Sequence, residues 1–189
     1  NMTDLYVYVF ASRNKDNKDL ENFKQRTLSF VSDEPLEQVK QEFDLFAEQG
    51  LDGEMSRLYM SLNPRRNKET LVGLVQNLVE KLSTDFPMTS HKLSNLLVSE
   101  ASKAPAKTNK WLFDFDYDSE QLLNEFVSDV KQYETEDKPL EVTLHKTPNG
   151  YAVVTSRGFD TRDLLAKWTN VENKRDGQLL VTWKRKGEA

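Results

Sequence analysis

The chain lacks cysteine altogether, and its 189 residues include only two histidines, His91 and His145. Without cysteine, disulfides, thiolate catalysis and cysteine-bound zinc or iron–sulfur sites are excluded. Two histidines are too few for a multi-histidine metal centre, so a metal would have to be bound by oxygen atoms. The composition fits a reducing compartment.

Long apolar runs are also missing. No segment approaches the ~18 to 20 apolar residues that a membrane-spanning helix needs. The segment from Met2 to Ser12 has neither the basic start nor the small-residue cleavage site of a secretory signal. We therefore expect a cytoplasmic protein with no membrane contact.

The net charge of −5 argues against general binding to nucleic acid, because an acidic field repels phosphate unless basic residues cluster. Local basic groups decide this question, although each also fits an ordinary solvated surface. Three such groups are Arg65, Arg66 and Lys68; Lys146, Arg157 and Arg162; and Lys184, Arg185 and Lys186.

Residues 1–105 are predicted to form an α/β portion. Their alternating and helically spaced apolar residues predict strands at 4–11, 26–31 and 57–62, and helices at 35–49, 67–82 and 90–101. The polar segment from Ser102 to Asn109 contains a proline and is the best linker candidate. We therefore place a boundary between portions 1–105 and 106–189, which could still form one compact domain.

Residues 106–189 show a clearer order of elements. The pattern predicts strands at 111–116, 140–146, 151–156 and 179–183, with helices after Ser119 and from Thr161. Asn149-Gly150 favours a hairpin turn with positive φ between the middle strands. The result is β-α-β-β-α-β, the order of ferredoxin-like and RNA-recognition-type sheets, so the fold class is α+β.

The strand at 111–116 ends in closely spaced carboxylates. Because side chains alternate along a strand, Asp114 and Asp116 share one face, about 7 Å apart, and Phe113 and Phe115 share the other. A divalent cation such as Mg²⁺ or Mn²⁺ would relieve the repulsion between the two carboxylates. The alternative is that both are surface residues at the end of a strand.

Other residues could complete a site around this pair. The hairpin pairs beside the acidic strand in the predicted order, so Lys146, Asn149 or Arg157 could contact a phosphate held by a metal. Asp160 is either a helix cap or a third acidic ligand. Arg162, near the start of the same helix, is a further phosphate contact.

The acidic strand, the hairpin from Thr147 to Gly150 and the later Phe159-Asp160 together resemble the catalytic core of archaeo-eukaryotic primases and primase-polymerases. The resemblance covers about Lys110 to Trp183. It implies an RNA-recognition-like sheet and nucleotidyl transfer in DNA replication, with Mg²⁺ or Mn²⁺ on Asp114 and Asp116. Asp160 matches the family's third acidic residue only loosely.

One residue departs from the family pattern. Ala152 stands where the family has a histidine that contacts the nucleotide, and His145 precedes the turn and is not an obvious substitute. His145 could also serve in acid–base chemistry or be structural. The leading hypothesis is a primase-like protein that binds nucleotides or nucleic acid, with weakened or lost transfer activity. The style of the sequence resembles bacteriophage proteins, which implies the host cytoplasm.

Two other functions stay open. Residues 113–116 resemble the nucleophile strand of haloacid-dehalogenase phosphatases, with Thr155 or Ser156 as a second motif, but that fold uses a parallel sheet and an early nucleophile strand. The chain could instead be a noncatalytic viral accessory protein that binds a host protein. That function predicts no metal affinity and tolerance of Asp114→Asn.

Overall fold

The computed structural model describes residues 4–188. The chain divides into two compact units, Asn1–Lys107 with Leu180–Ala189, and Thr108–Leu179. The sequence placed all of 106–189 in one portion, whereas residues after Leu179 belong to the N-terminal unit. Each unit combines a four-stranded sheet with helices, which confirms the α+β class.

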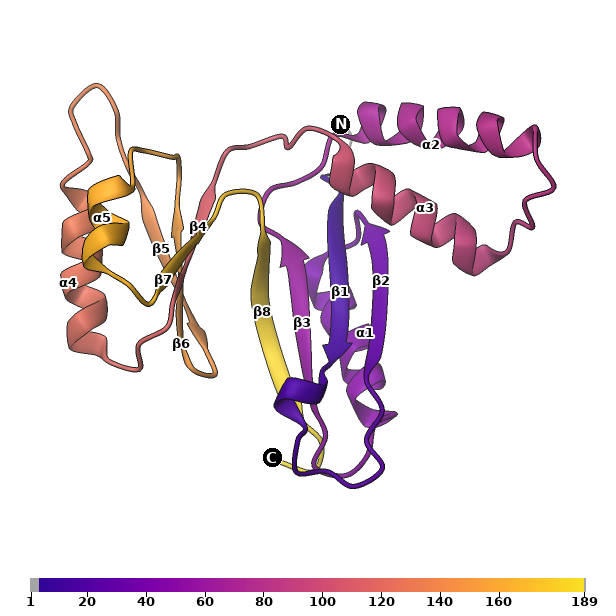
Figure 1. Ribbon diagram of the computed structural model, residues 1–189, viewed down its shortest axis with the longest axis horizontal. Coiled ribbons are helices and arrows are strands. Elements are labelled where there is room, and N and C mark those ends of the chain that lie inside the picture. The colour runs from indigo at the N-terminus through magenta and orange to yellow at the C-terminus, as the bar shows by residue number, and fades with distance from the viewer. Residues whose placement is uncertain (1–3, 189) are drawn as a thin grey trace. The chain divides into compact units, whose positions relative to one another are not determined.

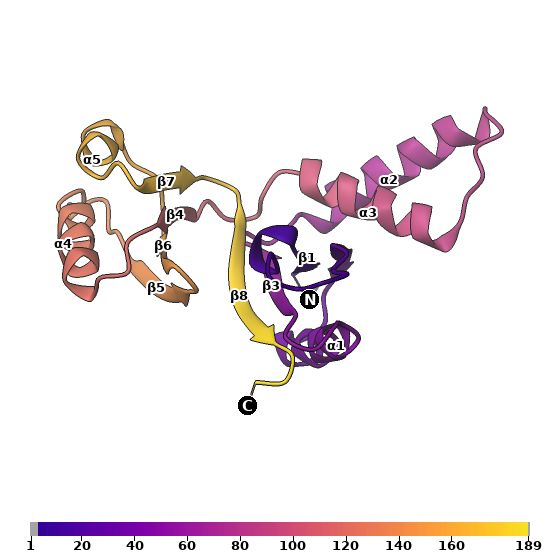
Figure 2. The same cartoon turned by 60° about the horizontal axis from the view of Figure 1, so that its bottom comes forward.

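Within the described residues, the N-terminal unit contains a four-stranded sheet and three α-helices. Its strands are, in spatial order, β2 (Arg26–Ser32), β1 (Tyr6–Ser12), β3 (Met55–Ser61) and β8 (Gln178–Arg185). Strand β1 pairs antiparallel with both β2 and β3, and a 3₁₀ turn, η1 (Asn14–Asp16), follows β1. Helix α1 (Leu36–Glu48) covers one face of this sheet (Figures 1 and 2).

The core of the N-terminal unit lies between α1 and that face. Alternation along β1 turns Tyr8 and Phe10 toward the helix, where they meet Val39 and Phe43. The rings of Phe10 and Phe43 lie edge to face at 5.5 Å between centroids. The inward-facing residues of β1 and the apolar side of α1 therefore pack together in one cluster rich in aromatic rings.

Helices α2 (Asn67–Leu82) and α3 (Ser90–Lys103) run side by side and extend away from this sheet (Figures 1 and 2). Arg65 anchors them at the sheet end. Its backbone N–H donates to the Leu5 carbonyl at 2.7 Å, and its guanidinium donates to the carbonyls of Ala101 and Ala104. None of the helices in the described residues is long and apolar enough to cross a bilayer.

The C-terminal unit has the predicted β-α-β-β-α-β order. Its elements along the chain are β4 (Trp111–Phe115), α4 (Glu120–Lys131), β5 (Val142–Thr147), β6 (Gly150–Thr155), α5 (Arg162–Lys167) and β7 (Val171–Lys174). The strands lie in the order β5-β6-β4-β7, with every neighbouring pair antiparallel. Both helices lie on one face of the sheet (Figure 1), and the apolar core lies beneath them.

The closing strand of this unit differs from the prediction. The strand predicted at 179–183 lies in β8, which belongs to the N-terminal sheet, and β7 takes its place. Val181 of β8 packs against the N-terminal core. Strand β7 carries the sequence Val-Glu-Asn-Lys, with Val171 as its one buried residue, so alternation gave no signal for it.

The hairpin between β5 and β6 also differs from the prediction. Thr147 pairs with Gly150, so Pro148 and Asn149 form the turn. Among the described residues, positive φ occurs at Asn22, Gly53 and Gly187, and the turn therefore needs none. Glycine is required at position 150 for another reason: a Cβ there would lie 2.2 Å from the carbonyl oxygen of Phe115.

Candidate functional site

The carboxylate of Asp114 lies on the sheet face opposite the helices. Its neighbours Phe113 and Phe115 are fully buried in the core beneath α4 and α5, so alternation turns Asp114 the other way. Asp114 lies directly opposite Ala152 of β6 and Glu172 of β7, and Ala152 in turn lies opposite His145 of β5. Directly opposed residues share a face. One row across the sheet therefore reads His145, Ala152, Asp114, Glu172, and we call it the acidic row.

A lysine offsets part of the negative charge in this row. Lys174 of β7 places its Nζ 3.6 Å from a carboxylate oxygen of Asp114, whose side chain is 48% exposed. Glu172, two residues earlier in β7, is exposed on the same face. These three charged groups lie on the neighbouring strands β4 and β7. A phosphate could replace Asp114 as the partner of Lys174, and a cation could replace Lys174 as the partner of Asp114.

Asp116 lies just beyond the end of β4. Its backbone N–H donates to the Asn170 carbonyl at 3.0 Å, so the pairing of β4 with β7 continues by one hydrogen bond beyond the strands. Asp116 is exposed. The oxygen donors of Asp114, Asp116 and Glu172 are the type that Mg²⁺ and Mn²⁺ prefer. Within residues 4–188, no group of three or more such side chains is already gathered as a metal site. The donors therefore fit these ions in type, with water and phosphate oxygens completing the shell.

His145 joins this face from the neighbouring strand. Burial lowers the pKa of its imidazole below the usual 6.5, and the positive charge of Lys110 lowers it further. The ring is therefore neutral at physiological pH and can donate one hydrogen bond and accept another. The sequence could have placed it here, because a two-residue turn at Pro148 and Asn149 fixes the pairing of 145 with 152.

Lys146 lies on the other face from His145. Its Nζ is 3.2 Å from a carboxylate oxygen of Asp118 and 4.4 Å from the ring centroid of Tyr151. Tyr151 packs against the helix-covered core. The predicted phosphate contact from Lys146 to the Asp114 face is therefore not made in this structure, since the two side chains point to opposite sides of the sheet. Asn149, at the turn, is exposed and lies outside the acidic row.

Arg157 is committed to holding loops together. Its guanidinium donates to four backbone carbonyls, those of Tyr133, Lys138, Pro139 and Gly158. These carbonyls belong to the loop between α4 and β5 and to the segment that precedes α5. The structure thus gives Arg157 a bracing role, and does not bring it to Asp114.

Asp160 and Arg162 pair with each other at the start of α5. The carboxylate accepts from the Arg162 guanidinium at 2.6 Å and from its backbone N–H at 3.2 Å. These hydrogen bonds lower the pKa of Asp160 to about 2. The preceding Phe159 stacks on Phe113 and Tyr133, which places this segment on the helix-covered side. The predicted third acidic ligand is therefore not near Asp114, and Glu172 is the carboxylate that the sheet supplies instead.

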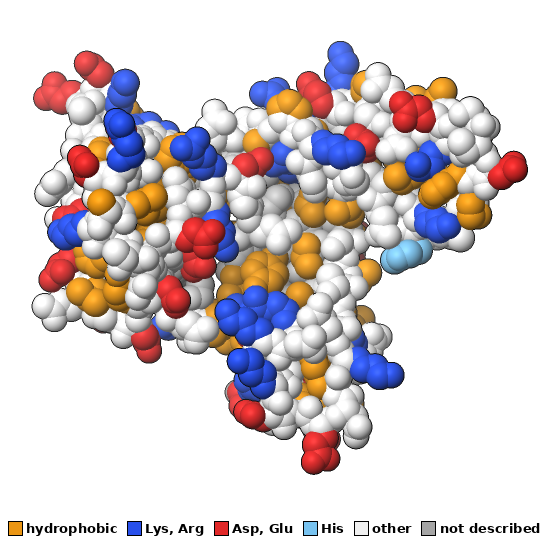
Figure 3. All heavy atoms as spheres, in the orientation of Figure 1, with side chains coloured by type: hydrophobic (Ala, Val, Ile, Leu, Met, Phe, Trp, Pro, Cys, Tyr) orange, Lys and Arg blue, Asp and Glu red, His pale blue; other side chains and the backbone are white. Residues whose placement is uncertain are grey.

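The basic groups of the sequence are largely occupied within the fold. Arg65 is buried, while Arg185 donates to the Gly53 carbonyl at 2.8 Å and Lys186 to the Gly50 carbonyl at 3.0 Å. On the face drawn in Figure 3, Lys and Arg side chains are interspersed with Asp and Glu. No group of the three therefore forms an open basic surface with all its members available.

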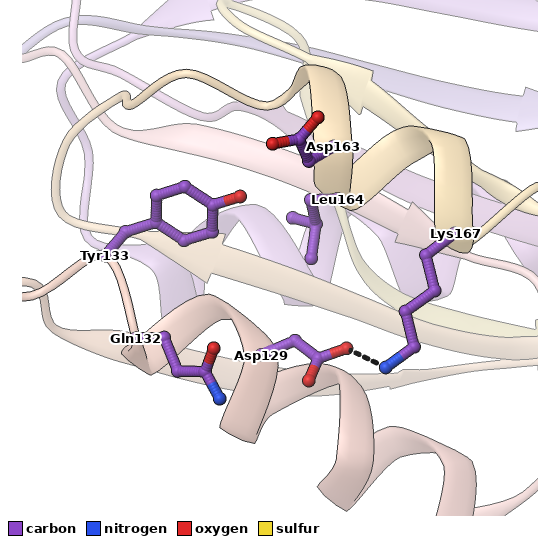
Figure 4. Close-up of a pocket in the computed structure, with 6 residues that line it drawn as sticks. All are labelled: Asp129, Gln132, Tyr133, Asp163, Leu164 and Lys167. Carbon is purple, nitrogen blue, oxygen red and sulfur yellow. Dashed lines mark hydrogen bonds and ion pairs between the residues drawn. The ribbon is translucent and has the colours of Figure 1, made fainter.

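A hollow of about 380 Å³ lies between α4 and α5 (Figure 4). Its lining residues are Asp129, Gln132, Tyr133, Asp163, Leu164 and Lys167. Asp129 accepts from Lys167 at 2.7 Å and from the Trp168 indole at 2.9 Å, and these bonds lower its pKa. Burial raises the pKa of Tyr133, and the nearby negative charges add to this effect. With its one lysine already paired, the hollow does not suit a phosphate.

Sequence reasoning missed Glu172 and Lys174, because β7 was not predicted. It also missed that His145 shares the face of Asp114. Comparison of the chain with protein-family models, with curated proteins and with solved structures gives no match. The candidate site therefore rests on the residues and their geometry alone.

Proposed function

We propose that the chain is a primase-like protein that binds a nucleotide with Mg²⁺ or Mn²⁺ at the acidic row, with weakened or lost nucleotidyl transfer. The supporting observation is the register of the C-terminal sheet. Asp114, the position equivalent to the family's histidine (Ala152) and an actual histidine (His145) lie side by side in one row. These are the elements that the resemblance requires on neighbouring strands.

A nucleotide fits this face better than a long nucleic acid does. The net charge is −5, and the basic groups are largely engaged within the fold. Aromatic side chains that could stack bases lie on the helix-covered side in the described strands of this sheet, namely Trp111, Phe113, Phe115 and Tyr151. Recognition would therefore depend on the phosphates rather than on stacked bases.

The side chains in and beside the acidic row have distinct roles in this proposal. Asp114 and Asp116 hold the cation, which supplies positive charge against the phosphate oxygens. Lys174 exchanges its ion pair with Asp114 for a phosphate oxygen. The neutral imidazole of His145 reaches across the methyl group of Ala152 and donates a hydrogen bond to the bound nucleotide. Because Ala152 itself supplies no hydrogen-bond donor, we expect nucleotide binding to be retained while nucleotidyl transfer is weakened or lost.

The haloacid-dehalogenase alternative finds no support in the sheet. Strand β4 lies between two antiparallel neighbours, β6 and β7, whereas that fold needs a parallel sheet around its nucleophile strand. We therefore do not propose phosphatase activity.

The test is a calorimetric titration of Mn²⁺ into the full chain, with and without a nucleoside triphosphate. We expect the wild type to bind Mn²⁺ more tightly when the nucleotide is present, because phosphate oxygens complete the shell. Asp114→Asn/Asp116→Asn should weaken the binding by at least about tenfold, since it removes both charged ligands.

Asp160→Asn is the matched control, because it removes a carboxylate of the same unit that lies on the helix-covered side. We expect it to bind as the wild type does. If the wild type binds no Mn²⁺ in either condition, or if Asp160→Asn weakens binding as much as the double variant, the acidic row is not the site. If the wild type binds Mn²⁺ and the double variant does not, primer-extension assays on the wild type measure how much transfer remains.

A further inference from the structure

Helix α2 exposes a stripe of apolar side chains. Five of them are between 46% and 84% exposed. These residues, which we call the α2 stripe, are Leu71, Val72, Val75, Val79 and Leu82. Figure 3 shows apolar side chains exposed on the α2–α3 hairpin. The sequence predicted the helix from the spacing of Leu71, Leu74, Val75, Leu78 and Leu82, and three of these residues belong to the exposed stripe rather than to the core.

Helix α3 covers only the other side of α2. Asn77 donates from its side chain to Glu100 of α3 at 3.1 Å. At Gly73, an added Cβ would lie 2.4 Å from a carboxylate oxygen of Glu100, so the two helices are in close contact there. Thr70, on the same side, is fully buried. The α2 stripe lies around the helix from these contacts, and its side chains are exposed.

The spacing of the stripe is that of a helix–helix seam. Leu71, Val75, Val79 and Leu82 follow one another at intervals of four, four and three residues, which keeps one line of side chains facing a partner helix. The five exposed side chains present on the order of 500 Å² of apolar surface, near the upper end for a typical monomer. Two such surfaces together reach about 1,000 Å², the lower limit of a specific interface.

We propose that the α2 stripe binds the α2 stripe of a second copy of this chain, with the two helices antiparallel and centred on Val75. Charge decides the direction. Lys68 is the exposed charged residue that continues the stripe at its N-terminal end. A parallel pair would place both copies of Lys68 together, which is unfavourable.

The antiparallel pair places each Lys68 at the C-terminal turn of the other copy's helix. The negative end of the helix dipole lies at that turn and attracts an ammonium group. The antiparallel pair also sets Leu71 against Val79 and leaves Val75 against itself at the twofold axis. This interface lies in the N-terminal unit, so it does not depend on the proposed nucleotide site in the C-terminal unit.

Sedimentation velocity of the full chain over a broad range of concentration tests the association. We expect a monomer that becomes a dimer as the concentration rises. Val75→Glu places two like charges in contact at the axis and should abolish the dimer. Gln76→Glu adds the same charge on an exposed position beside the stripe and should leave the dimer intact. Circular dichroism of both variants verifies that α2 still forms.

Removal of one charge tests the direction of pairing. Lys68→Ala should weaken the antiparallel dimer several-fold, because it removes the attraction to the C-terminal end of the other copy's helix, whereas in a parallel pair it would remove a repulsion and strengthen the dimer. A Lys68→Ala variant that dimerises more strongly than the wild type would overturn the antiparallel arrangement. A wild type that stays monomeric at every concentration would overturn self-association, as would a Val75→Glu variant that dimerises like the wild type.

Discussion

At several positions of this chain, the contact made in the fold explains why that residue type is needed. Gly150 follows Asn149 in a pattern typical of a positive-φ turn, yet the structure needs glycine there because β6 passes close to the backbone of Phe115. Arg65 and Arg157 look like surface cations in the sequence, yet they donate to backbone carbonyls. A sequence pattern gives the type of residue but not the contact that requires it.

Gly150→Ala should destabilise the C-terminal unit by about 1–3 kcal/mol, because the added methyl group meets a carbonyl oxygen of the central strand that cannot move without breaking the sheet. Asn149→Ala, at the exposed neighbouring turn position, should change the free energy of unfolding by less than about 0.5 kcal/mol. Urea denaturation of both variants measures this. Equal effects at the two positions would show that the turn, and not the close approach, needs the glycine.

His145 should make the stability of the chain depend on pH. Its pKa in the folded chain lies below the usual 6.5, mainly through burial, so the unfolded chain binds the proton more readily. The free energy of unfolding therefore falls as the pH drops through 6.5, and the loss is complete once the folded form is protonated too. We expect an effect below about 1 kcal/mol, because the ring is only half-buried and solvent screens it.

The measurement is urea denaturation from about pH 7.5 to about pH 5, above the range where the lowered carboxylate pKa values matter. His145→Gln should flatten the profile, while His91→Gln, which changes an exposed residue of α3, should leave the slope of the wild type. A profile unaffected by His145→Gln would assign the pH dependence to other groups.

At the scale of elements, the sequence predicted those that have both a clear period and a local end signal. Helix α4 is an example, because Ser119 caps it by accepting from the Leu122 N–H at 3.2 Å, and its apolar residues recur on one side. Strand β7 could not be predicted, since its place depends on pairing with β4 rather than on its own residues. The acidic row was accordingly half predicted: Asp114 follows from alternation, and Glu172 follows only from the partner strand.

Strand β8 was predicted as a strand but placed in the wrong sheet. Its apolar residues correctly predicted a strand, but local sequence cannot say which sheet a strand joins. Pairing with β3 joins segments far apart in the chain. Beside it, the Arg185 guanidinium donates to the Gly53 carbonyl across 132 positions. The predicted order placed β8 in the nearer sheet, because neighbouring strands usually pair.

A chain that ends at Leu179 should therefore damage the N-terminal unit while the C-terminal unit stays protected. It loses the edge strand beside β3 and the contact of Val181 with the core. We expect amide hydrogens of β3 to exchange about tenfold faster or more, with those of β4 and β6 unchanged. A chain ending at Lys186 keeps β8 and is the control. Equal loss of protection in both units would show that they unfold as one.

At the scale of the whole molecule, the chain passes from the N-terminal unit into the C-terminal unit and back again. The two proposed surfaces belong to different units: the acidic row to the sheet β5-β6-β4-β7, and the α2 stripe to a hairpin of the other unit. Loss of one surface by substitution should therefore leave the other in place. The functional proposals can fail separately, and each experiment distinguishes them.

The return of β8 to the first sheet also sets an order of events during synthesis. The ribosome releases residues 108–179 as one continuous segment, so the second sheet can close on its own strands. The first sheet must wait with an open edge along β3 until residue 185 has emerged, although its other strands are made much earlier. An open strand edge is where chains associate wrongly, so a nascent chain is most vulnerable to aggregation in this interval.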